Sequence, residues 1–326
     1  MLLAQDHAVA EVVSPAEFYH GKIVRILVGS PPGGGYDTYA RLITQALSSR
    51  LGATVLVENK EGNGGLASLA MLLVRPADGL TIVSGSAEAA IISQMLARPG
   101  VTWDVTKLNW LAKMATAPKL WFVSKNNPRY PTVADTKRAD PLTWSATGPA
   151  DDVSDVQAVI SYALGLKSKI VTGYRGSGDM SLAVIQNEVD SGLLSADSAL
   201  PRIGSIKPLA LFGSKRWSHL PDVPTLTEAA TVPADKMWII TLREQIGEAQ
   251  RALIAAPGVP QDRVDYLRRV LADVLTDPSV VDEGARTNRE IEYMSGADLQ
   301  KLVVDLTESA RPHLGELHKI LIDTYF

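Results

Sequence analysis

Short β-branched runs alternate with helical patterns along the first part of the chain, and this alternation constrains the fold more than any other sequence feature. Ile23–Val28 is a β-branched run with glycines close to both ends, which is typical of a buried strand. Apolar residues recur at helical spacing over Tyr36–Arg50, and Gly52 follows as a helix stop. The next predicted strand, helix and strand are Thr54–Val57, Leu66–Val74 and Leu80–Ser84. This order predicts a parallel sheet with right-handed crossovers.

A second α/β series follows the first. Its predicted strands are Lys119–Val123, Leu142–Ser145, Ser168–Val171 and Leu209–Phe212, with helices at Val153–Leu164 and Met180–Asn187. Helices are also predicted from Pro260 and from Leu299, whereas residues 1–19 are weakly patterned and read as a loose lead-in. With 326 residues the chain is long enough for two domains, so we expect two α/β lobes with a cleft between them.

The composition excludes several classes of protein. A net charge of −4 argues against a protein that coats nucleic acid or an anionic membrane. The chain has no cysteine, which rules out disulfides, thiolate nucleophiles and cysteine-ligated metal sites. No run approaches 18 apolar residues, so no membrane span is expected. The opening MLLAQDHAVA is too short for a complete signal peptide, and this leaves a cytosolic protein or one whose signal is absent or trimmed.

Two glycine-rich loops each join a predicted strand to a helix. Ser30–Thr38 contains three successive glycines, and Glu61–Gly65 contains three glycines in five residues. Exposed backbone N–H groups beside a helix N-terminus form an anion site, and both loops belong to the ligand-binding edge of a parallel sheet. Neither loop matches a P-loop or a dinucleotide fingerprint. Each loop alone is equally consistent with a tight strand–helix turn, but their equivalent places favour binding of a small anion or carboxylate.

Several further strings form a recognisable combination. Phe18–Asp37 reads FYHGKIVRILVGSPPGGGYD and Val55–Gly65 reads VLVENKEGNGG. Later come Ala77–Thr81 (ADGLT), Leu220–Thr225 (LPDVPT) and Ala255–Pro260 (AAPGVP). In this combination the chain resembles the Bug family, the extracytoplasmic solute-binding receptors of tripartite tricarboxylate transporters. The resemblance covers nearly the whole chain from Phe18 onward.

The resemblance implies a two-lobe type II periplasmic binding protein, or Venus flytrap, with mainly parallel sheets flanked by helices. Lobe 1 would comprise residues 18–115 and 215–326, including the C-terminal helices, and lobe 2 would comprise residues 116–214. The chain would cross between them near Ala112–Pro118 and Phe212–Trp217, and a ligand would lie in the cleft. The implied partners are a small carboxylate and the membrane permease subunits of the transporter, with no nucleic acid. The receptor would be a periplasmic monomer.

By position, the resemblance also implies the ligand contacts. In lobe 1 they are Pro32, Gly33, Gly34, Gly35, Tyr36, Asp37, Gly62, Asn63, Gly64, Gly65 and Ser86, and in lobe 2 they are Thr147, Arg175, Gly176 and Ser195. The family binds carboxylates here through backbone N–H groups and ordered waters. No metal ligand and no cofactor are implied.

Some positions depart from the family pattern and leave alternatives open. Tyr36 stands where Thr or Ser is common, so it either stacks on a flat ligand or packs on the buried face of its helix. Arg175 either pairs with a ligand carboxylate or is a solvated surface side chain. Ser195 lacks the usual acidic neighbour. Asp151 and Asp152 would repel an anion, and we interpret them as helix caps that point away from the cleft.

No catalytic pattern accompanies the loops. The five histidines show no metal-binding spacing, and no nucleophile elbow occurs. The sequence therefore predicts a non-enzymatic receptor for a dicarboxylate, tricarboxylate or aromatic carboxylate. A cytosolic α/β enzyme for a phosphorylated or carboxylate substrate, and a ligand sensor that reports to a signalling partner, remain alternatives.

Overall fold

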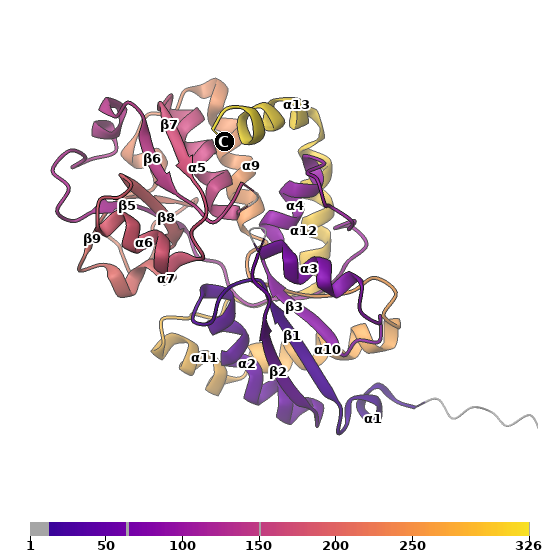
Figure 1. Ribbon diagram of the computed structural model, residues 1–326. Helices are drawn as coiled ribbons and strands as arrows, with labels where there is room; N and C mark the ends of the chain where they lie inside the picture. The colour runs from indigo at the N-terminus through magenta and orange to yellow at the C-terminus, as the bar shows by residue number, and fades with distance from the viewer. Residues whose placement is uncertain (1–12, 63–64, 150, 326) are drawn as a thin grey trace, which may run out of the picture.

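The computed structural model describes residues 13–62, 65–149 and 151–325, and in these the chain forms two sheets with helices around each (Figure 1). The first is a six-stranded sheet in the order β11-β4-β10-β3-β1-β2. Its strands are β1 Ile23–Val28, β2 Thr54–Asn59, β3 Thr81–Gly85, β4 Asn109–Lys113, β10 Ala252–Ala255 and β11 Met294–Ser295. The second is a five-stranded sheet in the order β7-β6-β8-β5-β9. Its strands are β5 Lys119–Ser124, β6 Leu142–Ser145, β7 Ser168–Val171, β8 Ser191–Ser195 and β9 Ile206–Phe212.

The expectation of mainly parallel sheets is wrong, because both sheets are mixed. β1 runs parallel to β2 and β3, as predicted, but β10 lies antiparallel between β3 and β4. In the second sheet β6 is parallel to β7 and β8, whereas β5 is antiparallel to β8 and β9. The antiparallel pairs arise where the chain enters or re-enters a sheet from the other one, so no βαβ crossover fixes their direction.

Helices cover the faces of both sheets. The longer ones are α2 Gly35–Leu51, α3 Leu66–Leu73, α4 Ala87–Met95, α5 Asp152–Leu164, α6 Ser177–Ile185, α9 Met237–Gly247, α10 Gln261–Leu275, α11 Pro278–Arg286 and α12 Gly296–Ser309. Short helices are α1 Pro15–Tyr19, α7 Ala196–Ala199, α8 Leu226–Ala229 and α13 Leu314–His318, and single turns are Ala134–Arg138, Leu200–Arg202, Ala234–Lys236, Arg311–His313 and Lys319–Asp323. The helix predicted at Tyr36–Arg50 corresponds to α2, and Gly52 caps it in the left-handed conformation at φ 61°.

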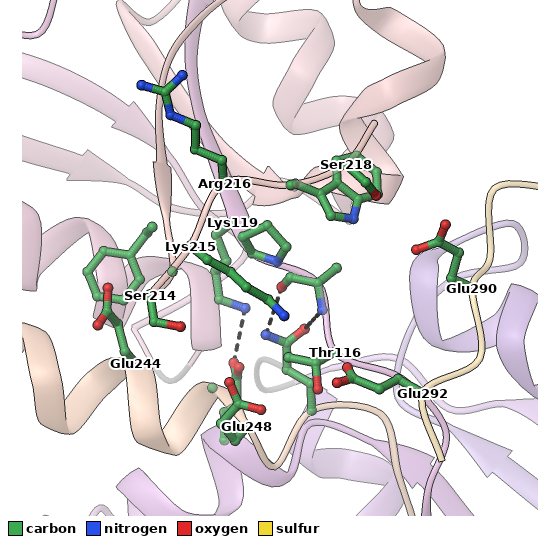
Figure 2. A pocket seen from close by; sticks show the side chains of 18 of the residues that line it. Thr116, Lys119, Ser214, Lys215, Arg216, Ser218, Glu244, Glu248, Glu290 and Glu292 are labelled. Carbon is green, nitrogen blue, oxygen red and sulfur yellow. Dashed lines mark hydrogen bonds and ion pairs between the residues drawn. The ribbon is translucent and has the colours of Figure 1, made fainter. Parts of the chain in front are cut away.

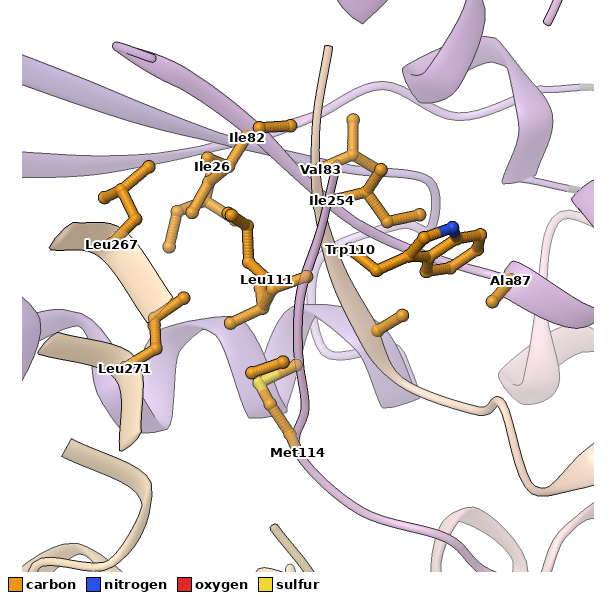
Figure 3. Packing of buried hydrophobic residues seen from close by; sticks show 14 of the residues in the cluster. Ile26, Ile82, Val83, Ala87, Trp110, Leu111, Met114, Ile254, Leu267 and Leu271 are labelled. Atoms are coloured by element: carbon orange, nitrogen blue, oxygen red, sulfur yellow. The ribbon is translucent and has the colours of Figure 1, made fainter. Parts of the chain in front are cut away.

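Two hydrophobic cores lie under these layers. In the first, Ile26 and Ile82 from the sheet pack with Leu267 and Leu271 from α10, as Figure 3 shows. The second centres on Trp121 and Trp144, whose ring centroids are 5.1 Å apart. Because each core is continuous and separate, each sheet forms a lobe with its own hydrophobic interior.

The two ends of the described chain differ from the expectations. The loose lead-in is wrong for its last residues, because Pro15–Tyr19 is a helix with a capping box at Ser14, and Tyr19 is fully buried. At the other end, apolar residues of α9 and α13 belong to the second core rather than the first, and Figure 1 shows α13 near α9 and α5. The exact lobe boundaries stay a prediction, and these two helices argue for moving part of 215–326 into lobe 2.

Candidate ligand-binding site

A cavity of about 350 Å³ lies between the two lobes, where strands end and helices begin. Its walls come from the connections that follow β1, β2, β6 and β7, from the end of β8 and from Arg251 just before β10. In α/β sheets the carboxyl ends of the strands are the usual place for a ligand. The topology therefore brings five loops, distant in sequence, to one polar cavity.

Most of the predicted contact residues line this cavity. They are Gly34, Gly35, Tyr36, Gly62, Gly65, Thr147, Arg175, Gly176 and Ser195. Pro32, Gly33, Asp37 and Ser86 do not line it, and Asn63 and Gly64 lie outside the described residues. Their roles in binding stay predictions, but the cavity and the loops chosen from the sequence coincide.

Three of the longer helices in the described part of the chain begin at the cavity with a glycine N-cap and no side-chain cap. Their N-cap residues are Gly34 for α2, Gly65 for α3 and Gly176 for α6. The first turn of a helix has N–H groups without internal partners and about half a positive charge. The arrangement thus directs backbone donors from both lobes at one volume, which suits an anion.

Asp37 holds the first glycine loop in shape instead of lining the cavity. Its carboxylate accepts hydrogen bonds from the Gly33 N–H, the Asn59 amide and Arg41 Nε, each at 2.9 Å. Burial opposes its ionisation, yet these partners hold the pKa of Asp37 below its usual value. The side chain is therefore an ionised brace for the loop.

Tyr36 lines the cavity, and Ser86 lies close to its phenol without lining the cavity. Ser86 caps α4 by accepting the Ala89 N–H. Burial, followed by the nearby Asp152 and Glu88 carboxylates, raises the pKa of Tyr36 well above its usual value. Tyr36 therefore presents a neutral phenol here.

Arg175 is a surface side chain in this structure. It lines the cavity mouth, but its side chain is 80% exposed and its Nε donates to Asp179 at 2.9 Å. These contacts fit the interpretation of Arg175 as a solvated surface side chain. A ligand carboxylate could pair with Arg175 only by displacing Asp179 from it.

The two lobes touch each other around the cavity. An added Cβ at Gly176 would lie 3.0 Å from the Pro31 ring, and one at Gly35 would lie 3.1 Å from Ser198 Oγ. Side chains larger than glycine would hold these loops apart. Both walls are consequently close enough to enclose a small molecule.

Asp151 and Asp152 both line the cavity, while their carboxylates bond to the loop before α5 and to Lys119. Asp151 is the N-cap of α5, as the cap interpretation required. Its Oδ1 accepts the Val153 N–H, and its Oδ2 accepts the Thr147 N–H and hydroxyl. Burial, and then the adjacent Asp152 carboxylate, raise the pKa of Asp151 to about 7.

Asp152 belongs to a buried ionic cluster behind the cavity. Lys119 Nζ lies 2.6 Å from Asp152 and 3.0 Å from Glu88, and Arg243 lies 3.1 Å from Glu88. All four residues are more than nine-tenths buried, and Glu88 is fully buried. Burial disfavours the charge on Asp152, but Lys119 overrides it and holds the pKa of Asp152 well below its usual range.

A second cavity of about 820 Å³ lies on the side of the two chain crossings. Thr116–Lys119 and Phe212–Ser218 line it together with Glu244, Glu248, Glu290 and Glu292. Figure 2 shows Lys119, Glu244 and Glu248 at this cavity. Glu88, Lys119 and Arg243 also line it, so the ionic cluster separates the two cavities. The glycine loops lie at the smaller cavity, which is therefore the better candidate for the ligand.

Comparison with known proteins identifies the family. A model described as the tripartite tricarboxylate transporter family receptor matches residues 39–317. The chain belongs to this family. BugT of Bordetella pertussis is 23% identical over 286 residues, which cover 84% of this chain and 83% of BugT. A UPF0065 protein in the TAR-I ttuE-ttuC' intergenic region of Agrobacterium vitis is 26% identical over 282 residues, covering 84% and 77%. The predicted resemblance to the Bug family is confirmed.

Solved structures of such receptors share the fold. R. palustris Rpa4515 with adipate has a TM-score of 0.75 at 23% identity, covering 92% of this chain and 97% of that one. The periplasmic binding protein BugD has a TM-score of 0.76 at 20% identity, covering 94% and 100%. MatC from Rhodopseudomonas palustris with bound malate has a TM-score of 0.72 at 21% identity, covering 92% and 99%. The predicted two-lobe α/β fold is confirmed.

Sequence reasoning missed Arg251 in this receptor. Its side chain is 3% exposed, lines the smaller cavity, and donates to both Asp197 oxygens at 2.8 and 2.7 Å. Its guanidinium also lies 4.7 Å from the Tyr39 ring centre. Nothing around Arg251 in the sequence marks it, since Asp197 and Tyr39 come from distant elements.

The described residues show neither a metal-binding cluster nor a membrane-spanning helix. No group of three or more His, Asp or Glu side chains in that part of the chain has a metal-binding arrangement. None of the helices described is both long and apolar enough to cross a bilayer.

Proposed function

We propose that this receptor captures a small carboxylate in the cavity between its lobes and presents it to the membrane permease subunits of a tripartite tricarboxylate transporter. The ligand class is a dicarboxylate, tricarboxylate or aromatic carboxylate. The protein acts in the periplasm as a monomer and binds without converting its ligand. Lobe closure encloses the ligand, and opening releases it.

One observation carries this proposal: the helices α2, α3 and α6 begin at the cavity with glycine N-caps and no side-chain cap in the described chain. Neutral backbone donors bind an anion without a buried ion pair, whose desolvation cost is large. A receptor that must also release its ligand benefits from that weaker type of contact. The similar structures solved with adipate and with malate support a carboxylate ligand.

A thermal-shift screen tests the proposal. Small carboxylates are added to the whole chain at graded concentrations, with matched neutral amides as controls. A ligand that binds only the folded state adds about 2.7 kcal/mol to the free energy of unfolding at one hundred times Kd, and this raises the Tm. We expect at least one carboxylate to raise the Tm while its amide does not. A panel of carboxylates without any shift would contradict the proposal.

The alternatives give different outcomes in the same samples. An enzyme would convert the stabilising carboxylate, which chromatography of the incubated mixture detects as loss of the compound. A sensor would bind equally well but would fail to support uptake when returned to cells that lack the receptor. We expect intact ligand after incubation and restored carboxylate uptake.

A further inference from the structure

We propose that Asp197 of lobe 2 forms a latch with Arg251 and Arg289 of lobe 1, and that this latch holds the two lobes closed through contacts between protein atoms alone. Asp197 does not line the cavity, so it is a positioning residue that acts on binding through the position of the lobes. The closed position of the lobes stands apart from the proposed function. Its effect on affinity rests on that function.

The members of the latch belong to different hydrophobic cores. Asp197 lies in α7, and its neighbour Ala196 is buried in the second core. Arg251 immediately precedes β10, and Ala252 beside it is buried in the first core. Arg289 follows α11, which packs against α2. A contact between Asp197 and either arginine therefore joins the two lobes.

The Asp197–Arg251 pair is buried and close. Arg251 Nη2 donates to Asp197 Oδ1 at 2.8 Å and to Oδ2 at 2.7 Å, and Arg251 and Asp197 are 3% and 2% exposed. Lobe 1 orients the guanidinium, because its Nη1 donates to the Gln250 side chain at 2.9 Å and it lies 4.7 Å from the Tyr39 ring centre. Only Asp197 has to be brought to this arranged arginine when the lobes close.

Two more contacts attach α7 to lobe 1. Arg289 Nη1 donates to the Asp197 carbonyl oxygen at 3.0 Å, and Arg289 Nε donates to the Thr38 hydroxyl of α2 at 3.0 Å. Ser198 is the next residue of α7, and a Cβ added to Gly35 would lie 3.1 Å from its Oγ. The short helix α7 is therefore held by α2, by the residue before β10 and by the segment after α11.

The latch lies beside the segment in which the chain passes from β4 to β5. Gln250, next to Arg251, donates to the Ala117 carbonyl oxygen at 3.0 Å. Ala196, next to Asp197, donates its N–H to the Pro118 carbonyl oxygen at 2.8 Å. A contact so near a hinge separates only when the lobes rotate widely. The ion pair therefore controls the angle between the lobes.

Loss of the Asp197 charge should oppose closure specifically. In the closed position the Arg251 guanidinium is almost fully buried, and a buried charge without its partner is unfavourable. Opening admits water to the guanidinium, so the open state is not penalised in the same way. The pair thus shifts the balance between open and closed lobes. A receptor biased toward the closed state binds more tightly, because a larger fraction of it is competent to enclose the ligand.

Distances between two spin labels test the inference in the whole chain. The chain has no cysteine, so labels attach only where Ser49→Cys in α2 and Gln186→Cys at the end of α6 introduce one, both at exposed positions. The protein is refolded from urea to remove any bound molecule, and no carboxylate is added. We expect one narrow distance distribution with Asp197 in place, and a longer and broader one in Asp197→Asn. An unchanged distribution overturns the inference.

Asp190→Asn is the matched control. Asp190 is 8% exposed and forms an ion pair with Arg129, but it precedes β8 and its pair lies within lobe 2. We expect this variant to lower the free energy of unfolding and to leave the distance distribution narrow. Equal broadening in both variants would mean that loss of any buried aspartate opens the lobes, and the specific role of Asp197 would be overturned.

A double variant separates the ion pair from unrelated effects. Asp197→Asn and Arg251→Met break the same contact, so we expect their combination to open the lobes no further than Asp197→Asn alone. Additive broadening overturns the pairing. If Asp197→Asn fails to fold by circular dichroism, Arg289→Gln replaces it, because Arg289 is only half-buried. We expect a smaller broadening in the same direction there, and its absence overturns the latch.

Calorimetry with succinate, adipate and citrate extends the test to affinity. Those that bind the wild type should bind Asp197→Asn at least about tenfold more weakly, since fewer molecules are closed. Equal affinity overturns the link between the latch and binding. The proposed function fails separately, when a broad panel of carboxylates leaves the wild type unbound, and the label distances still decide the latch in that case.

Discussion

Two aspartates at the start of cavity-facing helices, one in each lobe, have opposite electrostatic settings. Asp37 lies in the first turn of α2, where Arg41 and two amide donors hold its pKa below the usual value. Asp151 is the N-cap of α5, where burial and the adjacent Asp152 raise its pKa to about 7. Both carboxylates accept hydrogen bonds from their own loops, so local helix geometry does not explain the difference.

Burial raises the pKa of both carboxyl groups, so the difference comes from their other partners. A guanidinium stands beside Asp37, and a second carboxylate stands beside Asp151. As a result, the lobe 1 wall presents mainly backbone donors to the cavity, because the ionised Asp37 carboxylate is turned to its loop and paired with Arg41. The lobe 2 wall presents a carboxyl group near its titration point. The two lobes therefore present different electrostatic surfaces to the cavity.

Removing the lysine that pairs with Asp152 behind the lobe 2 wall should have the largest effect on stability. Lys119→Met removes the ammonium between Glu88 and Asp152 and leaves two buried carboxylates with too little positive charge. We expect a loss of about 3–5 kcal/mol in the free energy of unfolding, measured by urea denaturation. Lys125→Met, at an exposed lysine just beyond the opposite end of β5, should leave stability unchanged. Similar losses in the two variants would contradict the role of the cluster.

Removing each aspartate in turn sharpens the comparison directly. Asp37→Ala loses a buried carboxylate with three charge-assisted partners, and we expect a cost of about 3 kcal/mol. Asp151→Ala loses an N-cap but also removes a desolvated carboxyl group, so we expect a cost of about 1 kcal/mol. Denaturation curves at pH 7 measure both, and equal costs would argue against the contrast.

Separating the two walls should weaken binding without unfolding the protein. Gly176 has extended backbone at φ 171°, so alanine is free of backbone strain there, but its Cβ would lie 3.0 Å from Pro31. We expect Gly176→Ala to weaken ligand binding about tenfold, about 1.4 kcal/mol, by calorimetry. Gly178→Ala is the control, since its Cβ would make an ordinary 3.7 Å contact with Arg202. Equal affinities in the two variants would show that the walls do not close on the ligand.

The pH dependence of stability should distinguish the aspartates by sign. The folded state raises the pKa of Asp151, so it binds a proton more tightly than the unfolded chain, and this contribution is lost as the pH rises from about 4 to about 7. The folded state lowers the pKa of Asp37, so its contribution is present above about 4 and is lost as the pH falls further. In wild type minus Asp151→Asn, we expect the difference in unfolding free energy to decline from pH 4 to 7. A rise over that window would refute the assignment.

The sequence was most informative where a local pattern decides the structure. Ile23–Val28 and the helix after it were predictable from periodicity, and the glycine loops from their places after strands. The strand at Ala252–Ala255 was missed, because four apolar residues in a row do not indicate a strand by themselves. They form one by pairing with β3 and β4. Its insertion also makes the sheet mixed.

The site was predictable only for the loops. Lys119 and Glu88 are 31 positions apart in the sequence, and Arg251 and Asp197 are 54 apart, so no local spacing predicts either contact. Asp151 was recognisable as a helix cap, but its direction depends on how β6 is placed against the other lobe. Tertiary juxtaposition, rather than residue type, turned these side chains into parts of a site.

Native mass spectrometry of the protein, purified without refolding, tests the central claim most directly. The account predicts that wild type retains one small carboxylate, identified by its released mass, and that Gly176→Ala retains less of it while Gly178→Ala retains as much as wild type. A bound molecule without a carboxylate, or the same carboxylate held equally by Gly176→Ala, would contradict a carboxylate site enclosed between the two glycine-bearing walls.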